Sequence, residues 1–245
     1  MPTRVGNGEA NRIAGGPGPD TIFGRDGEDR LLGRGGNDRL LGQDDDDRIQ
    51  GGGGNDRIFG GKGEDRAWGG SGNDILRDES GNDAFFGGRG KDVIHAGDGN
   101  DRLEGGKGSD LLYAGEGNDL LRGGAGRDRL AGGEGNDVMS GGSGRDRLFG
   151  GEGDDRMAGG RGRDTLTGGE GSDTFVFTRG RDTVTDFESG DDTVDLTSIR
   201  GLSSWTDVLN AARQAGDDVI FRFDEGTLRL EDTRKGALDQ DDFSF

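Results

Sequence analysis

The apolar residues of this chain are sparse and evenly spaced. From Gly6 to Thr185, 180 residues divide into 20 units of nine, and each unit carries one large apolar residue or alanine at the same position. The residue before it is polar in 14 units, and the residue after it is polar in some units and apolar in others. Alternation with period two predicts a short β-strand whose central side chain faces inward. The pattern therefore predicts a long series of short strands joined by tight turns.

The nine-residue unit can be written G-G-x-G-x-D-x-U-x, where U is apolar, as in the consecutive segments Gly132–Ser140, Gly141–Phe149 and Gly150–Ala158. The sixth position is aspartate in 19 of the 20 units and asparagine only at Asn11. The fourth position is glycine in 18 of 20, and the eighth is apolar throughout. Low-complexity sequence without a fold would not keep this register.

One apolar residue in nine cannot form a core alone, but stacked units can align these residues in continuous ladders. Glycine permits positive φ and close backbone approach, so six residues suffice for a tight turn. We expect two units per coil turn, with one strand on each of two facing sheets. Residues i and i+18 would then lie about 4.8 Å apart.

Composition alone would indicate disorder, because only 27% of the 245 residues are hydrophobic and 56 are glycine. The formal net charge of −19 excludes nucleic acid and anionic membranes as natural partners and favours cations. The chain has no cysteine, so disulfides and thiolate metal sites are excluded. No apolar run is long enough to span a membrane, and no cleavable N-terminal signal is visible.

The turns carry the candidate chemistry. An aspartate carboxylate at the sixth position and glycine carbonyls from turns 18 residues apart would supply only oxygen ligands, which calcium prefers at six to eight per ion. Magnesium fits an octahedral, hydrated site better, and zinc prefers His and Cys. Turn formation alone is the alternative reading, but it does not explain aspartate at one position in nine. The predicted carboxylate ligands are Asp20, Asp29, Asp38, Asp47, Asp56, Asp65, Asp74, Asp83, Asp92, Asp101, Asp110, Asp119, Asp128, Asp137, Asp146, Asp155, Asp164 and Asp173, and the predicted carbonyl ligands are Gly97, Gly99, Gly106, Gly108, Gly115, Gly117, Gly124, Gly126, Gly133, Gly135, Gly142, Gly144, Gly151, Gly153, Gly160 and Gly162.

The repeat resembles the nonapeptide of the RTX (repeats-in-toxin, haemolysin-type) calcium-binding proteins, and it covers about three quarters of the chain. The resemblance implies an all-β, right-handed parallel β-roll, a two-sheet solenoid with a small C-terminal cap of strands and one helix. We expect a degenerate N-terminal end over residues 1–14, the roll over 15–185, and a cap with a secretion signal over 186–245.

Several turns depart from the pattern, which puts calcium binding near them in question. Gly42–Asp47 lacks glycine at its second and fourth positions, and Asp78–Asp83 lacks both opening glycines. Arg25 and Arg34 also replace second-position glycine, and the first and last units are incomplete.

After Thr185 the composition changes. Ser204 is placed to cap a helix over Trp205–Gln214, which Gly216 would end. Asp218–Phe223 and Thr227–Glu231 alternate as two strands of a hairpin. This region resembles the C-terminal part of serralysin-like RTX proteins, which caps the roll and carries a type I secretion signal. The closing Asp241-Asp242-Phe243-Ser244-Phe245 is similar to such signals.

Catalysis is disfavoured by the inventory of side chains, and we expect no enzyme. His95 is the single histidine, so an H-E-x-x-H zinc site is excluded and a Ser-His-Asp triad would depend on an exposed strand residue. Gly142-Ser143-Gly144 is a repeat turn rather than a nucleophile elbow. Carboxylate pairs for glycoside hydrolysis would need a cleft, and here they are assigned to metal.

The sequence thus favours a secreted or cell-surface structural protein that folds on about ten to sixteen calcium ions after type I export and presents a rigid surface for adhesion, matrix formation or self-assembly. The expected partners are calcium and the type I secretion machinery. One alternative is an accessory module that binds an acidic polysaccharide through outward arginine and aromatic side chains. Another is the non-catalytic part of a secreted enzyme. Outward arginines could equally balance the turn aspartates, and outward apolar residues could reflect β-propensity.

Overall fold

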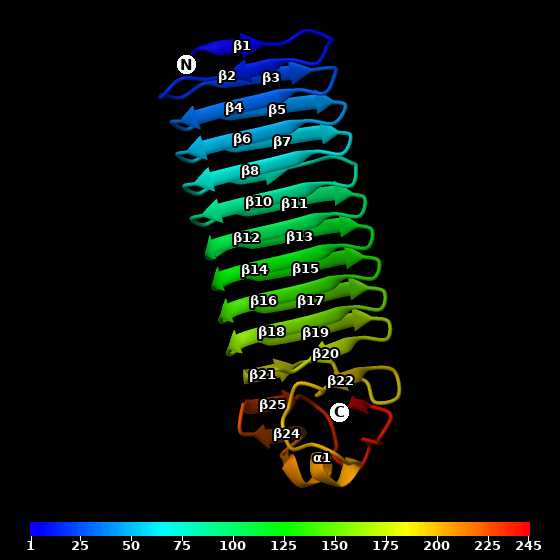
Figure 1. Cartoon of the computed structure of the whole chain (residues 1–245). Coiled ribbons are helices and arrows are strands. Elements are labelled where there is room, and N and C mark those ends of the chain that lie inside the picture. Colours follow the sequence, from blue (N-terminus) through cyan, green and yellow to red (C-terminus); the bar gives the residue numbers. More distant parts are fainter.

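The chain winds into a parallel two-sheet β-solenoid of about 11 turns, with one short helix and a few strands at its C-terminal end (Figure 1). The computed structural model describes residues 1–245. Strands alternate between the two sheets along the sequence, so two nonapeptides make each turn, as predicted.

Sheet A contains β1 (Thr3–Val5), β3 (Thr21–Arg25), β5 (Arg39–Asp44), β7 (Arg57–Lys62), β9 (Ile75–Arg77), β11 (Val93–Asp98), β13 (Leu111–Glu116), β15 (Arg129–Glu134), β17 (Arg147–Glu152), β19 (Thr165–Glu170) and β21 (Gly180–Val184). Sheet B contains β2 (Arg12–Ala14), β4 (Arg30–Gly35), β6 (Arg48–Gly53), β8 (Arg66–Ser71), β10 (Ala84–Arg89), β12 (Arg102–Gly108), β14 (Leu120–Gly126), β16 (Val138–Gly144), β18 (Arg156–Gly162), β20 (Thr174–Val176) and β22 (Thr193–Asp195).

The register places residue i beside residue i+18, which confirms the stacking predicted from the repeat. Leu112 pairs with Leu130 on sheet A, and Leu121 pairs with Met139 on sheet B. Most strands are longer than the predicted three residues, because pairing continues through the first glycines of the next unit, as between Gly106 and Gly124. The pairing does not depend on glycine, since Arg25 pairs with Gln43 at the same position.

The core is thin and continuous. The eighth-position residues from Ile22 to Val184 are all buried in one hydrophobic cluster that runs the length of the roll. Ile13 is only partly buried, because it belongs to the incomplete first unit at the open end. Each core residue therefore contacts mainly its neighbours one turn above and below, and the core depends on the stack as a whole.

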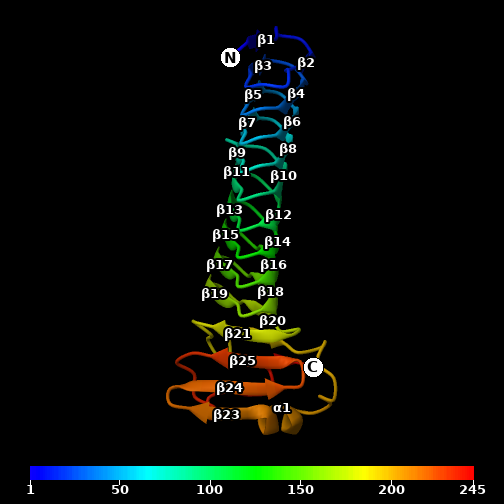
Figure 2. The same cartoon turned by 90° about the vertical axis from the view of Figure 1, so that its left-hand side faces the viewer.

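The C-terminal cap extends both sheets. In sheet A, β25 (Gly226–Leu230) lies parallel to β21, and β24 (Asp218–Phe223) and β23 (Ala212–Ala215) follow as antiparallel strands (Figure 2). The helix α1 spans Trp205–Ala211, and Ser204 caps it as predicted. The predicted helix end at Gln214 is wrong, because Ala212–Ala215 pairs with β24 instead of continuing the helix.

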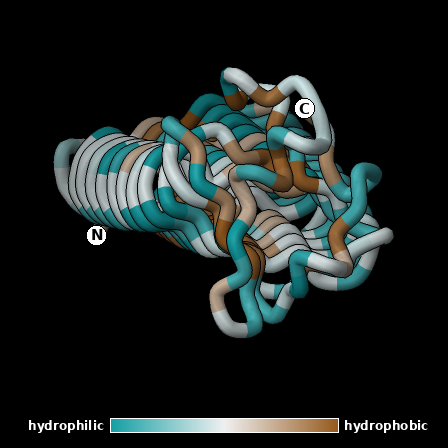
Figure 3. The backbone as a smooth tube through the Cα atoms, turned by 90° about the horizontal axis from the view of Figure 1, so that it is seen from below, coloured by the Kyte–Doolittle hydropathy of each residue, from teal (hydrophilic) through white to brown (hydrophobic).

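The chain terminus is part of the folded cap. The last strand, β26 (Phe243–Ser244), pairs in parallel with β22 and so closes sheet B. Phe243 is buried, and the buried carboxylate of Asp242 accepts hydrogen bonds from the Gly190 amide and the Ser189 hydroxyl, each at 2.9 Å. Figure 3 looks onto this end and shows apolar segments of the cap gathered over the last turns of the roll. None of the helices has the length and apolar character needed to cross a bilayer.

The core ladder can be tested at one turn. Leu121→Ala removes a fully buried side chain and leaves a cavity between two stacked neighbours, so we expect a loss of about 2–5 kcal/mol. Urea unfolding at saturating calcium measures it. Arg122→Ala, at the exposed adjacent position, is the control and should change stability by about 0.5 kcal/mol or less. Equal effects of the two substitutions would contradict the proposed core.

Candidate metal centres

The sixth-position aspartates form a hydrogen-bonded ladder along each edge of the roll. The Asp119 amide donates to Oδ1 of Asp137 at 2.8 Å, and the Asp137 amide donates to Oδ1 of Asp155 at the same distance. The other edge repeats this arrangement, for example from the Asp128 amide to Oδ1 of Asp146 at 2.9 Å. Every predicted aspartate from Asp20 to Asp173 is buried in one of these two ladders. Each carboxylate is thereby held in place by the turn before it.

The second oxygen of these carboxylates has no partner. In 16 ladder aspartates, from Asp29 to Asp164, Oδ2 is buried and accepts no hydrogen bond. A buried charge without a partner is costly, so such oxygens require either a proton or a cation. Sixteen repetitions of the same unpaired atom make this the main chemical feature of the molecule.

Where the first position is glycine, its backbone lies directly against the unpaired carboxylate and a carbonyl oxygen of the next turn, whereas Ala96 and Ala114 take this position before Asp101 and Asp119. A Cβ atom on Gly132 would contact both Oδ2 of Asp137 and the carbonyl oxygen of Gly150 in the next turn. The same pair of oxygens surrounds Gly123, where the contacts come from Asp128 and Gly141. A hard cation that takes oxygen ligands fits this donor set, and calcium is the ion that accepts many oxygens in flexible geometry.

The predicted carbonyl ligands lie in the same turns. All 16 predicted glycines have φ between 98° and 150°, a region that favours glycine. This conformation directs carbonyls along the stack, so that the Gly126 oxygen lies against Gly144 one turn later. The predicted carboxylates and carbonyls therefore belong to the same stacked turns, and all of them are oxygen donors of the kind that calcium prefers.

Burial raises the pKa of the ladder carboxylates. Desolvation is the largest cause for Asp101, Asp137 and Asp155, whose pKa values rise to about 7, and like charges one turn away raise them further. For Asp47 the same causes raise the pKa to about 8. Without a cation, these groups would hold protons near neutral pH, and a bound divalent ion would favour their ionised form.

The irregular turns keep the backbone of the regular ones. Arg25, Arg34, Gln43 and Asp45 all have positive φ, between 78° and 95°, at positions where the repeat has glycine. Asp45 also accepts a hydrogen bond from the Gly27 amide at 2.8 Å through its side chain. Pairing with the neighbouring turns thus holds these residues in a conformation that they would not favour alone.

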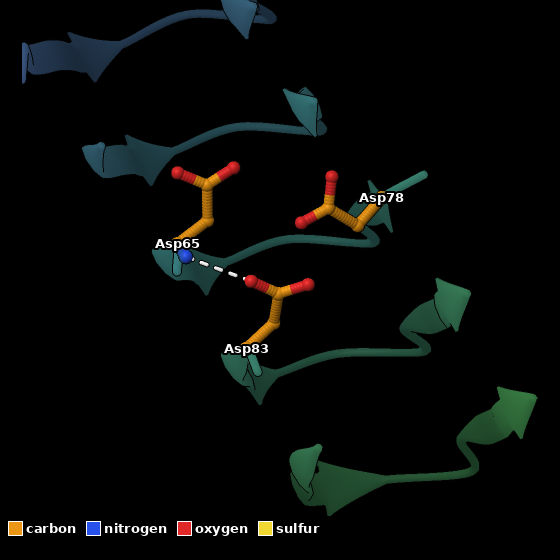
Figure 4. A group of neighbouring side chains, drawn as sticks. All are labelled: Asp65, Asp78 and Asp83. Carbon is orange, nitrogen blue, oxygen red and sulfur yellow. Dashed lines mark hydrogen bonds between the residues drawn. The ribbon is translucent and has the colours of Figure 1, made fainter. Parts of the chain in front are cut away.

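The turn that lacks both opening glycines contains an additional carboxylate. Asp78 occupies the first position of its unit and points toward Asp65 and Asp83, with one oxygen of each within 4.8 Å of the others (Figure 4). Burial raises the pKa of Asp78 to about 10 and that of Asp65 to about 7, and Oδ2 of Asp78 has no hydrogen-bond partner. Sequence analysis did not assign Asp78. An aspartate in phase with the first-position glycines was the signal that could have identified it.

His95 lies on the outer face of sheet A, away from these turns. Its ring stacks on that of Tyr113, with ring centroids 4.7 Å apart. Burial lowers the pKa of His95, and the positive charge of the nearby Arg77 lowers it further. His95 is a strand residue, as its ninth position in the repeat predicts, but it is half-buried rather than exposed.

The repeat that builds these turns matches a known family. The sequence profile of the RTX calcium-binding nonapeptide repeat matches residues 5–40, 41–76, 77–112, 113–148 and 149–184. No curated protein sequence matches. Among solved structures, the AlgE6R3 subunit of a mannuronan C5-epimerase from Azotobacter vinelandii is 29% identical, over 53% of this chain and 80% of that one, with a TM-score of 0.40. The extracellular lipase LipA from Serratia marcescens is 20% identical over the whole of this chain, with a TM-score of 0.39.

The family match covers the whole repeat region, so this chain belongs to the RTX calcium-binding nonapeptide repeat family. It is a repeat protein with a β-roll fold, and calcium is the expected ligand of its turns. The chain spans 40% of the length of the Serratia marcescens lipase that it matches.

The raised pKa values predict how the calcium-free chain responds to pH. A folded-state pKa above the unfolded value of about 3.9 means that the folded chain binds protons more tightly, so stability falls as pH rises from about 4 to about 8. In excess chelator, we expect more β-structure near pH 5 than near pH 8, measured by far-UV circular dichroism. A calcium-free chain with more β-structure at the higher pH would contradict this linkage.

Proposed function

We propose that this chain is an extracellular structural protein whose β-roll forms when calcium binds. The observation that carries the proposal is the set of 16 buried carboxylate oxygens without partners. A calcium-free roll would have to bury these charges or protonate them, and both alternatives are unfavourable at neutral pH. Binding and folding are therefore expected to be one event, as in other domains whose ligands converge only in the folded state.

The net charge of the chain also supports a coupling between calcium binding and folding. A chain of net charge −19 repels itself when compact, and about ten divalent ions would offset that charge. Extracellular calcium modules bind with dissociation constants of about 10⁻⁴–10⁻³ M, far above cytosolic calcium concentrations. The chain would stay unfolded before export and would fold outside the cell, where folding would hinder its return.

We assign the calcium ligands from the two ladders of sixth-position aspartates. The sixth-position carboxylates from Asp20 to Asp173, with second- and fourth-position glycine carbonyls such as those of Gly124 and Gly126, would hold about ten to sixteen ions at six to eight oxygens each.

We also propose the division into an N-terminal end at 1–14, the roll at 15–185 and the cap at 186–245. The last segment would carry the type I secretion signal, and its docking at Phe243 supports a signal that is accessible only before folding.

The outer faces support a second candidate function, binding of an acidic polysaccharide. Trp68 and Phe86 stack on sheet B with ring centroids 5.6 Å apart, and the Arg102 guanidinium lies 5.9 Å from the Phe86 centroid. Exposed aromatic rings beside arginines can bind a sugar ring and its carboxylate together. Glycan arrays with and without calcium test this function.

The calcium dependence has a direct test. In excess chelator near pH 8 we expect an expanded chain with little β-structure, and in about 10 mM calcium a compact roll. Far-UV circular dichroism and sedimentation velocity over a calcium titration measure both changes, which should share one midpoint. Equal β-structure with chelator and with calcium would refute the proposed function.

The ligand assignment can be tested at one aspartate. Asp137→Asn keeps an oxygen for the Asp119 amide but removes the charge, so we expect a loss of about 1–3 kcal/mol at saturating calcium and a higher folding midpoint. The matched control is Asp154→Asn. Exposed Asp154 accepts from the Ser172 amide at 2.8 Å, a role that asparagine already fills at Asn136. If both variants required the same calcium as the unmodified chain, the ligand role of Asp137 would be wrong.

A further inference from the structure

The two turn edges of the roll carry opposite charges. We define the basic edge as the exposed cations at the third and fifth positions of the units that lead into β11 to β21, namely Arg89, Lys91, Lys107, Arg127, Arg145, Arg161, Arg163, Arg179 and Arg181. No acidic residue occupies those positions there. The acidic edge comprises the same positions of the units that lead into β4 to β20, with Asp26, Glu28, Asp44, Asp46, Glu64, Asp98, Glu116, Glu134, Glu152, Asp154 and Glu170 against the single cation Lys62. The basic edge lies on the left in Figure 1 and faces the viewer in Figure 2.

Turn geometry does not require this segregation. Glu134 on one edge and Arg161 on the other occupy the same third position, both exposed, and each precedes a glycine of positive φ. The same backbone therefore accepts either charge. A preference for turn-forming residues would distribute acids and bases over both edges alike.

The basic edge also lacks side-chain hydrogen bonds of the kind that link successive turns on the acidic edge. On the acidic edge, fifth-position side chains accept from the next turn, as in the bond from the Asn118 amide to Asn100 and from the Asn136 amide to Asn118 at 2.8 Å. On the basic edge this ladder of asparagines ends at Asn73, which accepts from the Lys91 amide at 2.7 Å. Lysine and arginine side chains have no acceptor, so they cannot continue it. Their presence is not explained by turn stability.

The cations on this edge lack partners within the chain. The six ion pairs of the molecule involve none of them. Arg127, Arg145, Arg163 and Arg181 occupy successive turns at the same position, where like charges repel. Arg127 and Arg145, together with Lys91, border a groove of about 520 Å³ over the start of the strands of sheet A, and the ladder residues Asp92 and Asp128 also line it. A row of exposed cations without ion-pair partners, in a chain of net charge −19, offers a binding surface for an external anion.

We propose that this anion is the acidic edge of a second copy, so that folded rolls associate side by side, edge against edge. The two edges share one period, because both are built from the same stacked turns. They also occupy the same stretch of the roll, since the Arg127 turn lies between those of Glu116 and Glu134. A second roll displaced sideways, without rotation, therefore places its glutamates opposite these arginines along the whole row. A flexible polyanion would match the sign of the charge but not this fixed spacing.

The expected assembly is an open row. The contact uses different surfaces on the two partners, so it is heterologous, and a sideways displacement does not close into a ring. The inference rests on the proposed calcium-dependent folding, because the edges exist only in the stacked roll and calcium offsets the repulsion between acidic chains. Since the contact is between exposed charges, salt should weaken it.

Sedimentation velocity in about 10 mM calcium tests the proposal, with circular dichroism on the same samples. We expect association that grows with protein concentration and weakens about tenfold or more when ionic strength rises from about 0.05 to 0.5 M, without loss of β-structure. A calcium-loaded roll that stays monomeric at low salt would overturn the edge contact while leaving calcium-dependent folding intact. Absence of folding in calcium would instead refute the proposed function.

Two charge-reversal variants make the test specific. We expect Arg127→Glu, Arg145→Glu, Arg163→Glu and Arg181→Glu together to abolish self-association, and likewise Glu116→Lys, Glu134→Lys, Glu152→Lys and Glu170→Lys together. An equimolar mixture of the two variants should associate, because a basic edge again meets an acidic one. The control, Arg39→Glu, Arg57→Glu, Arg77→Glu and Arg122→Glu, makes the same change in net charge on the sheet faces and should still self-associate.

A failure of the mixture to associate, or an equal loss in the sheet-face control, would show that net charge rather than the edges governs association. Binding of an acidic polysaccharide by monomeric rolls, lost in the arginine variant, would assign the basic edge to that ligand and overturn the contact between copies.

Discussion

The structure depends on a buried carboxylate that the protein does not fully satisfy. Each ladder aspartate uses one oxygen to hold the turn before it and leaves the other without a partner, as Asp137 does between Asp119 and Asp155. In a conventional domain this arrangement would be unfavourable at every repeat. Under the proposed function it would make the fold conditional on a cation, and the same atoms that oppose folding without calcium would stabilise the roll once calcium is bound.

This constraint divides the nine positions of the repeat between different tasks. Glycines supply the positive φ and the space beside the carboxylate, aspartate supplies the charge, and the eighth residue supplies a narrow core. The third, fifth, seventh and ninth positions remain free of these tasks. The individual character of this chain lies there, in the opposed charges of the two edges and in the stacked rings of Trp68 and Phe86.

The C-terminal region covers the open end of the stacked turns. A roll exposes unpaired backbone and apolar core at its last turn, and the cap covers both by adding β25 to sheet A and β26 to sheet B. Because β26 contains Phe243, the acidic and apolar terminus that resembles an export signal is also a structural strand. Its two roles would operate at different times, before and after folding.

The sequence by itself determined the roll, because a period of nine kept through 20 units favours one stacking register, in which the strand pairs and the aspartate ladders join residues i and i+18. The aspartate ladders, the buried ladder from Ile22 to Val184 and the family followed from that period. Other features were decided only by the tertiary structure. Helix α1 ends at Ala211 because β24 competes for the next residues. Asp78 joins Asp83 of its own turn and Asp65 of the turn 18 residues earlier, because stacking brings the first position of one turn near the sixth position of the other. The separation of charge onto two edges likewise appears only when alternate units are assigned to opposite sides, since acids and bases are interleaved along the linear chain.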